Sequence, residues 1–423
     1  MDVSELGIIE IDEPPPPLDL TPADIEALAE ELLQYHAEFA PLYDRQEQAH
    51  WGYKYLQGLM LPLERKSIEP MALALEGGNV QAMQQFIGQG QWQDEALLQQ
   101  HWRLVNETLG ETDGVCIVDS SEFPKQGEHS VGVARQWCGR LGKVDNCQSG
   151  VFSAYASRKG YTLLDRRLYL PDEWFDAAHC ERWHRCGVPA TTSFKTKPVL
   201  ALEMLQALET ADCLRFRWVT CDEAFGRDGA FLDGVAALQR WYFAEVPHDT
   251  QVWLSRPATA VPAWAGRGRR PRKARLVPSA PAPQRVDQLA AAVPPDAWQA
   301  FLIKEGSKGP LVAEFAFQRG VAVRAGLPGP DMWIVLRRTW GETPELKVYL
   351  SNAPGHIPVP MLVRVAGMRW PIETAFEESK GGLGLDHYEV RSWLGWHHHM
   401  TLCLLAHHFL VRTRMRVKRG RQR

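Results

Sequence analysis

The sequence contains no long apolar run. No stretch approaches the roughly 18 consecutive apolar residues that a membrane-spanning helix needs. The first residues are acidic and lack the basic start of a secretory signal peptide. Only 8 cysteines are scattered over 423 residues, which is not the pattern of a disulfide framework. We therefore expect a cytoplasmic protein of two or three domains, without a membrane partner.

The formal net charge is -4, but acidic and basic residues are distributed unevenly along the chain. Thirteen acidic residues and one basic residue, Arg45, occur up to position 50. The last thirteen residues, 411–423, contain seven basic residues and no acidic one, and a second basic cluster, GRGRRPRKAR, covers 266–275. Such clusters are typical of surfaces that bind polyanions, although solvated tails and loops have the same composition. Any contact with nucleic acid must therefore involve limited basic surfaces rather than the whole protein.

The pattern of apolar residues changes several times along the chain and predicts an α/β fold. We expect a mixed sheet with flanking helices, an N-terminal helical region and a β-rich insertion. The predicted parts are an acidic, disordered leader (1–20), a helical region (21–112), the first part of the sheet domain (113–240), the insertion with its basic Pro/Arg-rich loop (241–357), a helical second part (358–410) and a basic tail (411–423).

Three carboxylates occur in settings that suit chemistry. Asp119 ends the predicted strand GVCIVD and Asp222 ends RWVTCD, and functional side chains gather at strand ends in α/β sheets. Glu373 lies in RWPIETAFEESKGG, where Pro371 opens a predicted helix and Gly381–Gly382 end it. Taken singly, an Asp at a strand end is more often a turn former or a helix cap.

A group of three carboxylates would require divalent cations, because the acids repel one another. Oxygen ligands without a recurrent His or Cys spacing suit Mg²⁺ or Mn²⁺. Two such ions, about 3.5–4 Å apart, can activate an attacking oxygen and stabilise the leaving oxygen of a phosphodiester.

Three segments of the chain resemble the DDE-type transposases of bacterial insertion sequences, and the similarity is closest to a branch with a β-rich insertion. The segments begin with VDSSEFPKQGEHSVG, VTCDEAFG and RWPIETAFEESKGG, and the resemblance covers nearly the whole chain up to residue 410. It implies an RNase H-like domain in which Asp119, Asp222 and Glu373 are the catalytic and metal-binding residues for two Mg²⁺ (or Mn²⁺) ions.

The related Tyr-Arg-Glu-Lys signature is only partly present. Arg369, Glu373 and Lys380 fit its spacing, whereas Ala366 occupies the Tyr position. The departure puts in doubt any role that this Tyr has in relatives, such as holding the phosphate of a DNA hairpin.

The resemblance implies metal-dependent cleavage of double-stranded DNA at the element's ends, followed by strand transfer into target DNA. The N-terminal helices would help to recognise the ends, and a homodimer or a higher synaptic complex would join them. Two alternatives stay open. One is an RNase H-like nuclease without strand transfer, and the other is a transposase-derived DNA-binding protein without catalysis.

The candidate DNA contacts are basic residues near the acids and in the insertion. They are Lys125, Arg135, Arg369, Lys380, Arg267, Arg269, Arg270, Arg272 and Lys273. Lys125 and Arg135 follow the first acid in a Gly-rich loop, where ordinary solvation is equally expected. The arginines of the insertion suit an A·T-rich minor groove, but phosphate binding without sequence preference is the more frequent use of such a loop.

Histidines and cysteines form two further patterns. His179, Cys180, His184 and Cys186 are too crowded for the usual arrangement of two separated zinc-ligand pairs. His397–His399 lie in a Trp-rich helical stretch and are expected at the surface or facing DNA rather than on a metal.

Overall fold

The computed structural model describes residues 22–264, 266–267, 269–304, 311–340 and 344–421. The predicted acidic leader lies outside the described residues. Contacts divide the chain into two compact units. One contains Trp218–Met368, and we call it the 218–368 unit. The other combines Pro16–Arg217 with Arg369–Arg423, and we call it the composite unit.

The composite unit begins with the predicted helical region. Its helices are α1 (Pro22–Ala37), α2 (Gln46–Met60), α3 (Ile68–Ala74), α4 (Val80–Gly88) and α5 (Asp94–Leu109). The Asn79 side chain caps α4 by accepting a hydrogen bond from the Ala82 amide at 2.9 Å. In α5 the apolar residues Leu97, Leu98, Trp102 and Val105 recur at helical spacing and are buried.

An antiparallel sheet follows these helices in the same unit. It contains β1 (Val115–Pro124), β2 (Ala134–Cys138), β3 (Lys143–Ser157) and β4 (Gly160–Tyr169). Strand β3 pairs with β1, β2 and β4. A short turn joins β3 to β4, and two helices, α6 (Cys180–Arg185) and α7 (Lys197–Ala211), follow β4.

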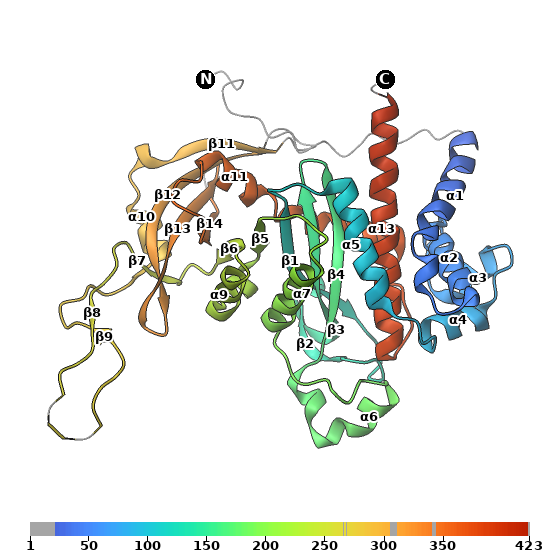
Figure 1. Cartoon of the computed structure of the whole chain (residues 1–423), viewed down its shortest axis with the longest axis horizontal. Helices are drawn as coiled ribbons and strands as arrows, with labels where there is room; N and C mark the ends of the chain where they lie inside the picture. Colours follow the sequence, from blue (N-terminus) through green and yellow to red (C-terminus); the bar gives the residue numbers. More distant parts are fainter. Residues whose placement is uncertain (1–21, 265, 268, 305–310, 341–343, 422–423) are drawn as a thin grey trace. The chain divides into compact units, whose positions relative to one another are not determined.

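The C-terminal helices pack on this sheet. They are α12 (Trp370–Leu383) and α13 (Trp393–Arg421). Helix α13 is 29 residues long and runs beside α2, α4, α5 and β4 (Figure 1). Leu402–Ala406 are all fully buried, so this segment is enclosed on every side. The predicted basic tail begins inside α13: Arg412 lies over the Tyr35 ring, Arg414 pairs with Glu378, and Arg416 pairs with Glu31.

The 218–368 unit has a mixed sheet. Its strands are β5 (Trp218–Cys221), β6 (Trp241–Val246), β7 (Gln251–Trp253), β10 (Gln284–Arg285), β11 (Gln299–Lys304), β12 (Leu311–Arg324), β13 (Leu327–Thr339) and β14 (Leu346–Ser351). Its helices are α8 (Glu223–Gly226), α9 (Gly229–Ala237), α10 (Val286–Ala292) and α11 (Val359–Gly367). Strands β5 and β6 are parallel, and β13 and β14 form an antiparallel pair. Ala325 and Gly326, both with positive φ, make the tight turn between β12 and β13.

A narrow two-stranded hairpin carries the basic loop of this unit. Strands β8 (Thr259–Ala260) and β9 (Arg275–Leu276) form its base, and the loop extends away from β7 and β12 (Figure 1). The side chains of Arg267, Arg269, Arg270, Arg272 and Lys273 are exposed. We call these five residues the basic arm.

The mixed α/β architecture confirms the predicted fold class. Antiparallel strands β1, β3 and β4, then a helix, then the parallel pair β5 and β6 follow one another along the chain, as an RNase H-like fold requires. Within the part of the chain that the structure describes, no helix combines the length and apolar character needed to cross a membrane.

Candidate active site

Asp119 lies in the middle of β1 rather than at its end, so that part of the prediction was wrong. The strand continues to Pro124 because its antiparallel pairing with β3 continues, with Asp119 opposite Phe152. Residues Val115–Val118 are fully buried, which fixes the backbone that carries the acid. The Asp119 side chain is only 15% exposed, and its Oδ1 accepts a hydrogen bond from the Ser120 amide at 2.7 Å.

Glu373 projects from the first turn of α12. Arg369 is the N-cap residue of this helix, and Pro371 stands in its first turn as predicted. A carboxylate in the first turn is favoured by the helix dipole. The predicted stop at Gly381–Gly382 was wrong. Both glycines lie inside α12, which ends at Leu383 and is followed by the C-cap residue Gly384 with φ of 67°, a conformation that favours glycine.

One arginine joins the first and third predicted acids. The Arg369 guanidinium lies 2.9 Å from Glu373 Oε1 and 3.9 Å from Asp119 Oδ2. All three side chains belong to the composite unit, and all are partly accessible to solvent. The fold therefore brings together two acids that are separated by more than half of the sequence.

Lys380 makes a second link between α12 and β1. Its Nζ donates a hydrogen bond to Ser121 Oγ at 2.8 Å, and it lies over the rings of Phe123 and Phe376. Burial lowers its pKa from the ordinary value. Ser121 is on the same face of β1 as Asp119, and Lys380 is on the same face of α12 as Glu373. The two cations thus hold the acid-bearing helix against the acid-bearing strand.

Asp222 belongs to the 218–368 unit and has a local structural role. It follows the fully buried strand β5 and caps α8, with Oδ1 accepting hydrogen bonds from the amides of Ala224 and Phe225 at 3.0 and 3.3 Å. Gly226 allows α8 to lie against β6, because a Cβ there would stand 1.9 Å from the Glu245 carbonyl oxygen. These contacts fix the direction in which the Asp222 carboxylate leaves the sheet.

The chemistry of Asp119 and Glu373 suits a hard cation. Both side chains offer carboxylate oxygens as ligands. The Arg369 guanidinium beside them already supplies a positive charge that offsets the repulsion between the two carboxylates. Over the described ranges of the chain, no three His, Cys, Asp or Glu side chains form a group that could hold a metal ion. Assembly of all three acids around Mg²⁺ or Mn²⁺ is therefore part of the proposal below.

The predicted DNA contacts fall into two classes. Arg135, on β2, and the basic arm are exposed. Lys125 instead lies 3.5 Å from the centre of the Tyr388 ring, and burial lowers its pKa to about 8. Its ammonium group is packed against the segment that follows α12 and also donates to the Tyr388 carbonyl oxygen at 3.4 Å, which stabilises that segment.

The prediction for the histidine run was wrong. His397, His398 and His399 are buried in α13 rather than exposed. His398 lies between the carbonyl oxygens of Ile87 and Trp92, at 3.0 and 3.2 Å, and stacks on the Trp92 ring. Burial lowers the pKa of His398 and His399 to about 4 and that of His397 to about 3. Neutral imidazoles therefore serve as packing and hydrogen-bonding groups of the core.

The crowded His-Cys motif around α6 is not a closed cluster. Cys186 is buried and its thiol donates to the His129 carbonyl oxygen at 3.4 Å, whereas Cys180 is exposed. The segment that follows α12 is also packed, since the Tyr388 hydroxyl donates to Gln148 Oε1 at 2.8 Å.

Two exposed tryptophans near these elements were not singled out from the sequence. Trp370, 53% exposed, directly follows Arg369, and Trp137, 60% exposed, lies on β2 two residues from Arg135. The high tryptophan content was the only signal, because 16 tryptophans in one chain give no indication of which are on the surface.

Comparison with known proteins identifies the family of this chain. A family described as "DDE superfamily endonuclease" matches residues 38–310, which is more than half of the chain. The match includes Asp119 and Asp222 and ends before Glu373. A protein of Microchaete diplosiphon named "Probable transposase for insertion sequence element IS701" is 27% identical over 180 residues, which are 42% of this chain and 43% of that protein. The chain thus spans less than half the length of this curated relative. It belongs to the DDE superfamily endonucleases.

Proposed function

We propose that this protein is the transposase of an insertion sequence, which cleaves DNA at the ends of its element and joins the freed 3′ ends to target DNA. The observation that carries the proposal is that the carboxylates of Asp119 and Glu373 both lie beside the Arg369 guanidinium. The two acids belong to elements that are far apart in the sequence. Membership of the endonuclease family and the partial likeness to a probable transposase support the same conclusion.

In this proposal Asp119, Asp222 and Glu373 hold two Mg²⁺ or Mn²⁺ ions. When bound, such ions would polarise the scissile phosphodiester and favour deprotonation of the attacking hydroxyl. The β1 strand and the first turn of α12 hold the carboxylates rigidly, so that little reorganisation is needed when charge develops. Arg369 keeps the acids together before the ions bind and is then placed to face a phosphate oxygen.

Lys380 has a positioning role in the proposal. Its bond to Ser121 Oγ ties α12 to the strand of Asp119, two residues from the acid itself. Movement of that helix by about 1 Å would misalign Glu373 with the other acids, and misplacements of this size can reduce catalysis about a hundredfold.

Double-stranded DNA is the proposed substrate, and exposed basic groups are its proposed contacts. Arg135 and the basic arm are accessible to phosphates, and the N-terminal helical region would add contacts at the element's ends. Two ends must be cut and joined in concert, so a homodimer or a larger synaptic complex is part of the proposal.

The test compares wild-type protein with Asp119→Asn on duplexes that carry the inverted repeats flanking the gene. With Mg²⁺, the wild-type protein should nick the ends and transfer the 3′ strand to a second duplex, whereas Asp119→Asn should bind the duplexes and do neither. Asp113→Asn, which changes the same residue type in the loop before β1, is the matched control and should retain both reactions.

The same experiment also distinguishes the proposed transposase from a nuclease without strand transfer and from a DNA-binding protein without catalysis. Cleavage without joined products would identify a nuclease of the same fold. Binding with no cleavage by the wild-type protein, or metal-dependent cleavage that survives Asp119→Asn, would contradict the catalytic assignment.

A further inference from the structure

The hairpin of β2 and the first part of β3, residues 134–147, leaves two apolar side chains exposed on one face. Trp137 is 60% exposed and Val144 is 52% exposed, and the two residues are directly opposite each other in the antiparallel pairing. Arg135 and Asn146 are also opposite each other and lie on the same face, because side chains alternate across a strand. We call this hairpin the ribbon and these four residues the ribbon face. Neighbouring exposed apolar side chains, unlike single ones, commonly mark a binding surface.

The accessible charges around the ribbon face are positive. Arg135 is the one charged residue of the face itself, and Arg140 and Lys143, at the turn of the ribbon, have side chains that are 53% and 64% exposed. The carboxylate partner of Arg140, Asp386, is only 12% exposed, and that of Lys143, Asp145, lies on the opposite face of the ribbon. An apolar pair within a basic surface suits a polyanion that also offers apolar groups, as DNA does.

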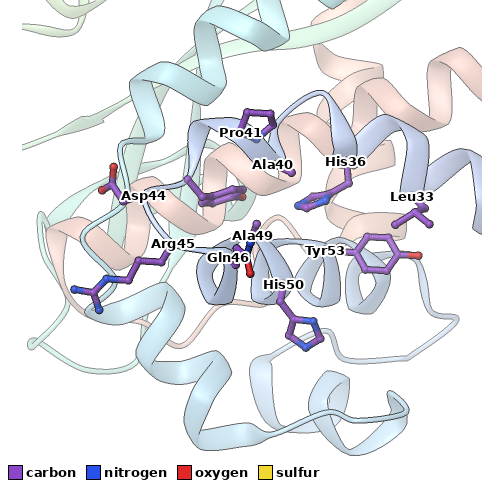
Figure 2. Close-up of a pocket in the computed structure, with 11 residues that line it drawn as sticks. Leu33, His36, Ala40, Pro41, Asp44, Arg45, Gln46, Ala49, His50 and Tyr53 are labelled. Carbon is purple, nitrogen blue, oxygen red and sulfur yellow. The ribbon is translucent and has the colours of Figure 1, made fainter.

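A pocket of about 560 Å³ in the N-terminal helical region has a different charge pattern. It lies between the end of α1 and the first half of α2, and Figure 2 shows Leu33 and Tyr53 at one end and Asp44 and Arg45 at the other. The opposite charges of Asp44 and Arg45 offset each other. The pocket therefore does not favour an anion as the ribbon face does.

The turn of the ribbon lies beside the strand of the first predicted acid. A Cβ on Gly139 would stand 3.4 Å from Glu122 Oε2, and Glu122 is three residues beyond Asp119 on β1. Arg140 pairs with Asp386, in the segment that follows α12. Three residues of a strand span about 10 Å, and duplex DNA rises about 3.4 Å per base pair. The ribbon is thus within a few base pairs of a phosphate held at Asp119.

We propose that the ribbon contacts the DNA within a few base pairs of the cleaved bond, with Trp137 and Val144 against bases and the basic side chains at neighbouring phosphates. Apolar side chains inserted at a base step partly unstack the bases and bend the duplex. The Trp137 ring then stacks on the base that has been freed. The position of the cleaved bond is taken from the proposed function, on which this inference rests.

A second copy of the chain is the alternative occupant of the ribbon face. A twofold axis would bring the Arg135 side chains of both copies, and both basic turns, close to one another. Like charges at such a contact repel each other, whereas DNA neutralises them. The charge around Trp137 therefore favours DNA over a second copy.

The experiment measures binding of the full chain to a duplex that carries one inverted repeat flanking the gene, in buffer with EDTA so that no cleavage occurs. Fluorescence anisotropy gives the affinity at several salt concentrations. A 2-aminopurine placed in turn at each position near the element's end reports unstacking. The variants are Trp137→Ala, Trp137→Phe and Arg135→Gln. Trp340→Ala, which removes a tryptophan that is 68% exposed in the 218–368 unit, is the matched control.

Trp137→Ala should weaken binding by about fivefold or more, as loss of one stacked base does. Its dependence on salt should stay unchanged, because no phosphate contact is removed, whereas Arg135→Gln should reduce the logarithmic slope by about 0.9. Trp137→Phe keeps a ring and should recover most of the affinity, and Trp340→Ala should bind as the wild-type protein does. The 2-aminopurine fluorescence should rise at one position with the wild-type protein and not with Trp137→Ala. Thermal unfolding verifies that each variant is folded.

Equal affinity of the wild-type protein and Trp137→Ala, or no binding of the duplex by the wild-type protein, would overturn the proposal. Sedimentation of the free protein tests the alternative occupant. If Trp137→Ala dissociates an oligomer in the absence of DNA, the ribbon face joins copies of the chain and the proposal is wrong. Equal affinity would leave the cleavage test with Asp119→Asn unaffected. Conversely, a wild-type protein that binds through Trp137 but does not cleave would contradict the proposed function and leave this inference intact.

Discussion

Two arginines in the composite unit each hold a pair of carboxylates, and their surroundings differ. Arg166 joins Asp94 and Asp165, and its side chain is 2% exposed. Arg369 joins Asp119 and Glu373, and its side chain is 17% exposed, with 34% for Glu373. We call these the closed and the open arginine clusters.

The difference in exposure indicates that the two clusters have different roles, although both consist of an arginine between two carboxylates. In the closed cluster, burial opposes ionisation of Asp94, but the Arg166 guanidinium holds its pKa well below the ordinary value. Such a network is fixed once its charges have left water. The open cluster remains in contact with solvent, so its acids can exchange one cation for another. A ligand therefore has access to the open cluster only, and the following predictions test this comparison.

The largest expected effect is on cleavage by the open cluster. Glu373→Gln keeps the size of the side chain but removes the charge that would hold a metal ion. Loss of one member of a catalytic set commonly reduces turnover by about 10³-fold or more. Glu377→Gln, on the same helix and exposed, should cleave at the wild-type rate. Rates of nicking on an end-bearing duplex would measure both, and equal rates would contradict the assignment of Glu373.

The next effect is on stability, and it should separate the two arginines. Arg166→Met leaves the Asp94 carboxylate buried without its cation, which should lower the free energy of unfolding by about 3–5 kcal/mol. Arg369→Met should lower it by less than Arg166→Met does, because the carboxylates of the open cluster stay partly accessible to water.

Urea unfolding of the two variants would measure this contrast. The double variant Asp94→Leu with Arg166→Met removes both charges of that pair, while Asp165 keeps its ion pair with Arg167, and it should recover much of the stability lost in Arg166→Met. Similar losses for the two single variants would show that the clusters do not differ as proposed.

The buried histidines predict a pH effect of intermediate size. Burial lowers the pKa of His101, His398 and His399 to about 4, while an unfolded histidine titrates near 6.5. Between these values the unfolded chain binds more protons. The free energy of unfolding should therefore be highest above about pH 6.5 and fall as the pH approaches 4.

Urea midpoints at several pH values would test this dependence. His399→Gln should flatten it, and His356→Gln, a change at an exposed position, should not. A midpoint that stays constant between pH 7 and 4.5 would contradict the account of α13 as a helix with neutral buried imidazoles.

We expect the smallest effect per substituted residue at the basic arm, where the measured quantity is DNA binding. Replacing its five residues by Gln should weaken DNA binding and reduce the dependence on salt by about 0.9 in the logarithmic slope for each lost phosphate contact. Arg285→Gln and Arg324→Gln provide the control, because these arginines of the same unit are paired with Asp287 and Asp233. An unchanged slope after removal of the arm would exclude it from the DNA interface.

Several features of the fold were predictable because they depend on local pattern. The helices α1 to α5 and the strands β11 to β14 follow from the spacing of apolar residues in their segments. The position of Asp119 within its strand was not predictable, because the length of β1 is set by its pairing with β3. Gly381 and Gly382 were misinterpreted because packing of α12 against β1 and β4 outweighs their weak helix propensity.

Residue type and charge pattern by themselves determined the candidate acids, the resemblance to a family and the location of the basic clusters. Only the tertiary structure decided that His397–His399 are core residues, that Lys125 packs on Tyr388, and that His36, Tyr43 and Tyr53 line one pocket. The physical reason is that burial depends on what covers a side chain. For these residues the covering groups come from other segments, and no local spacing reveals them.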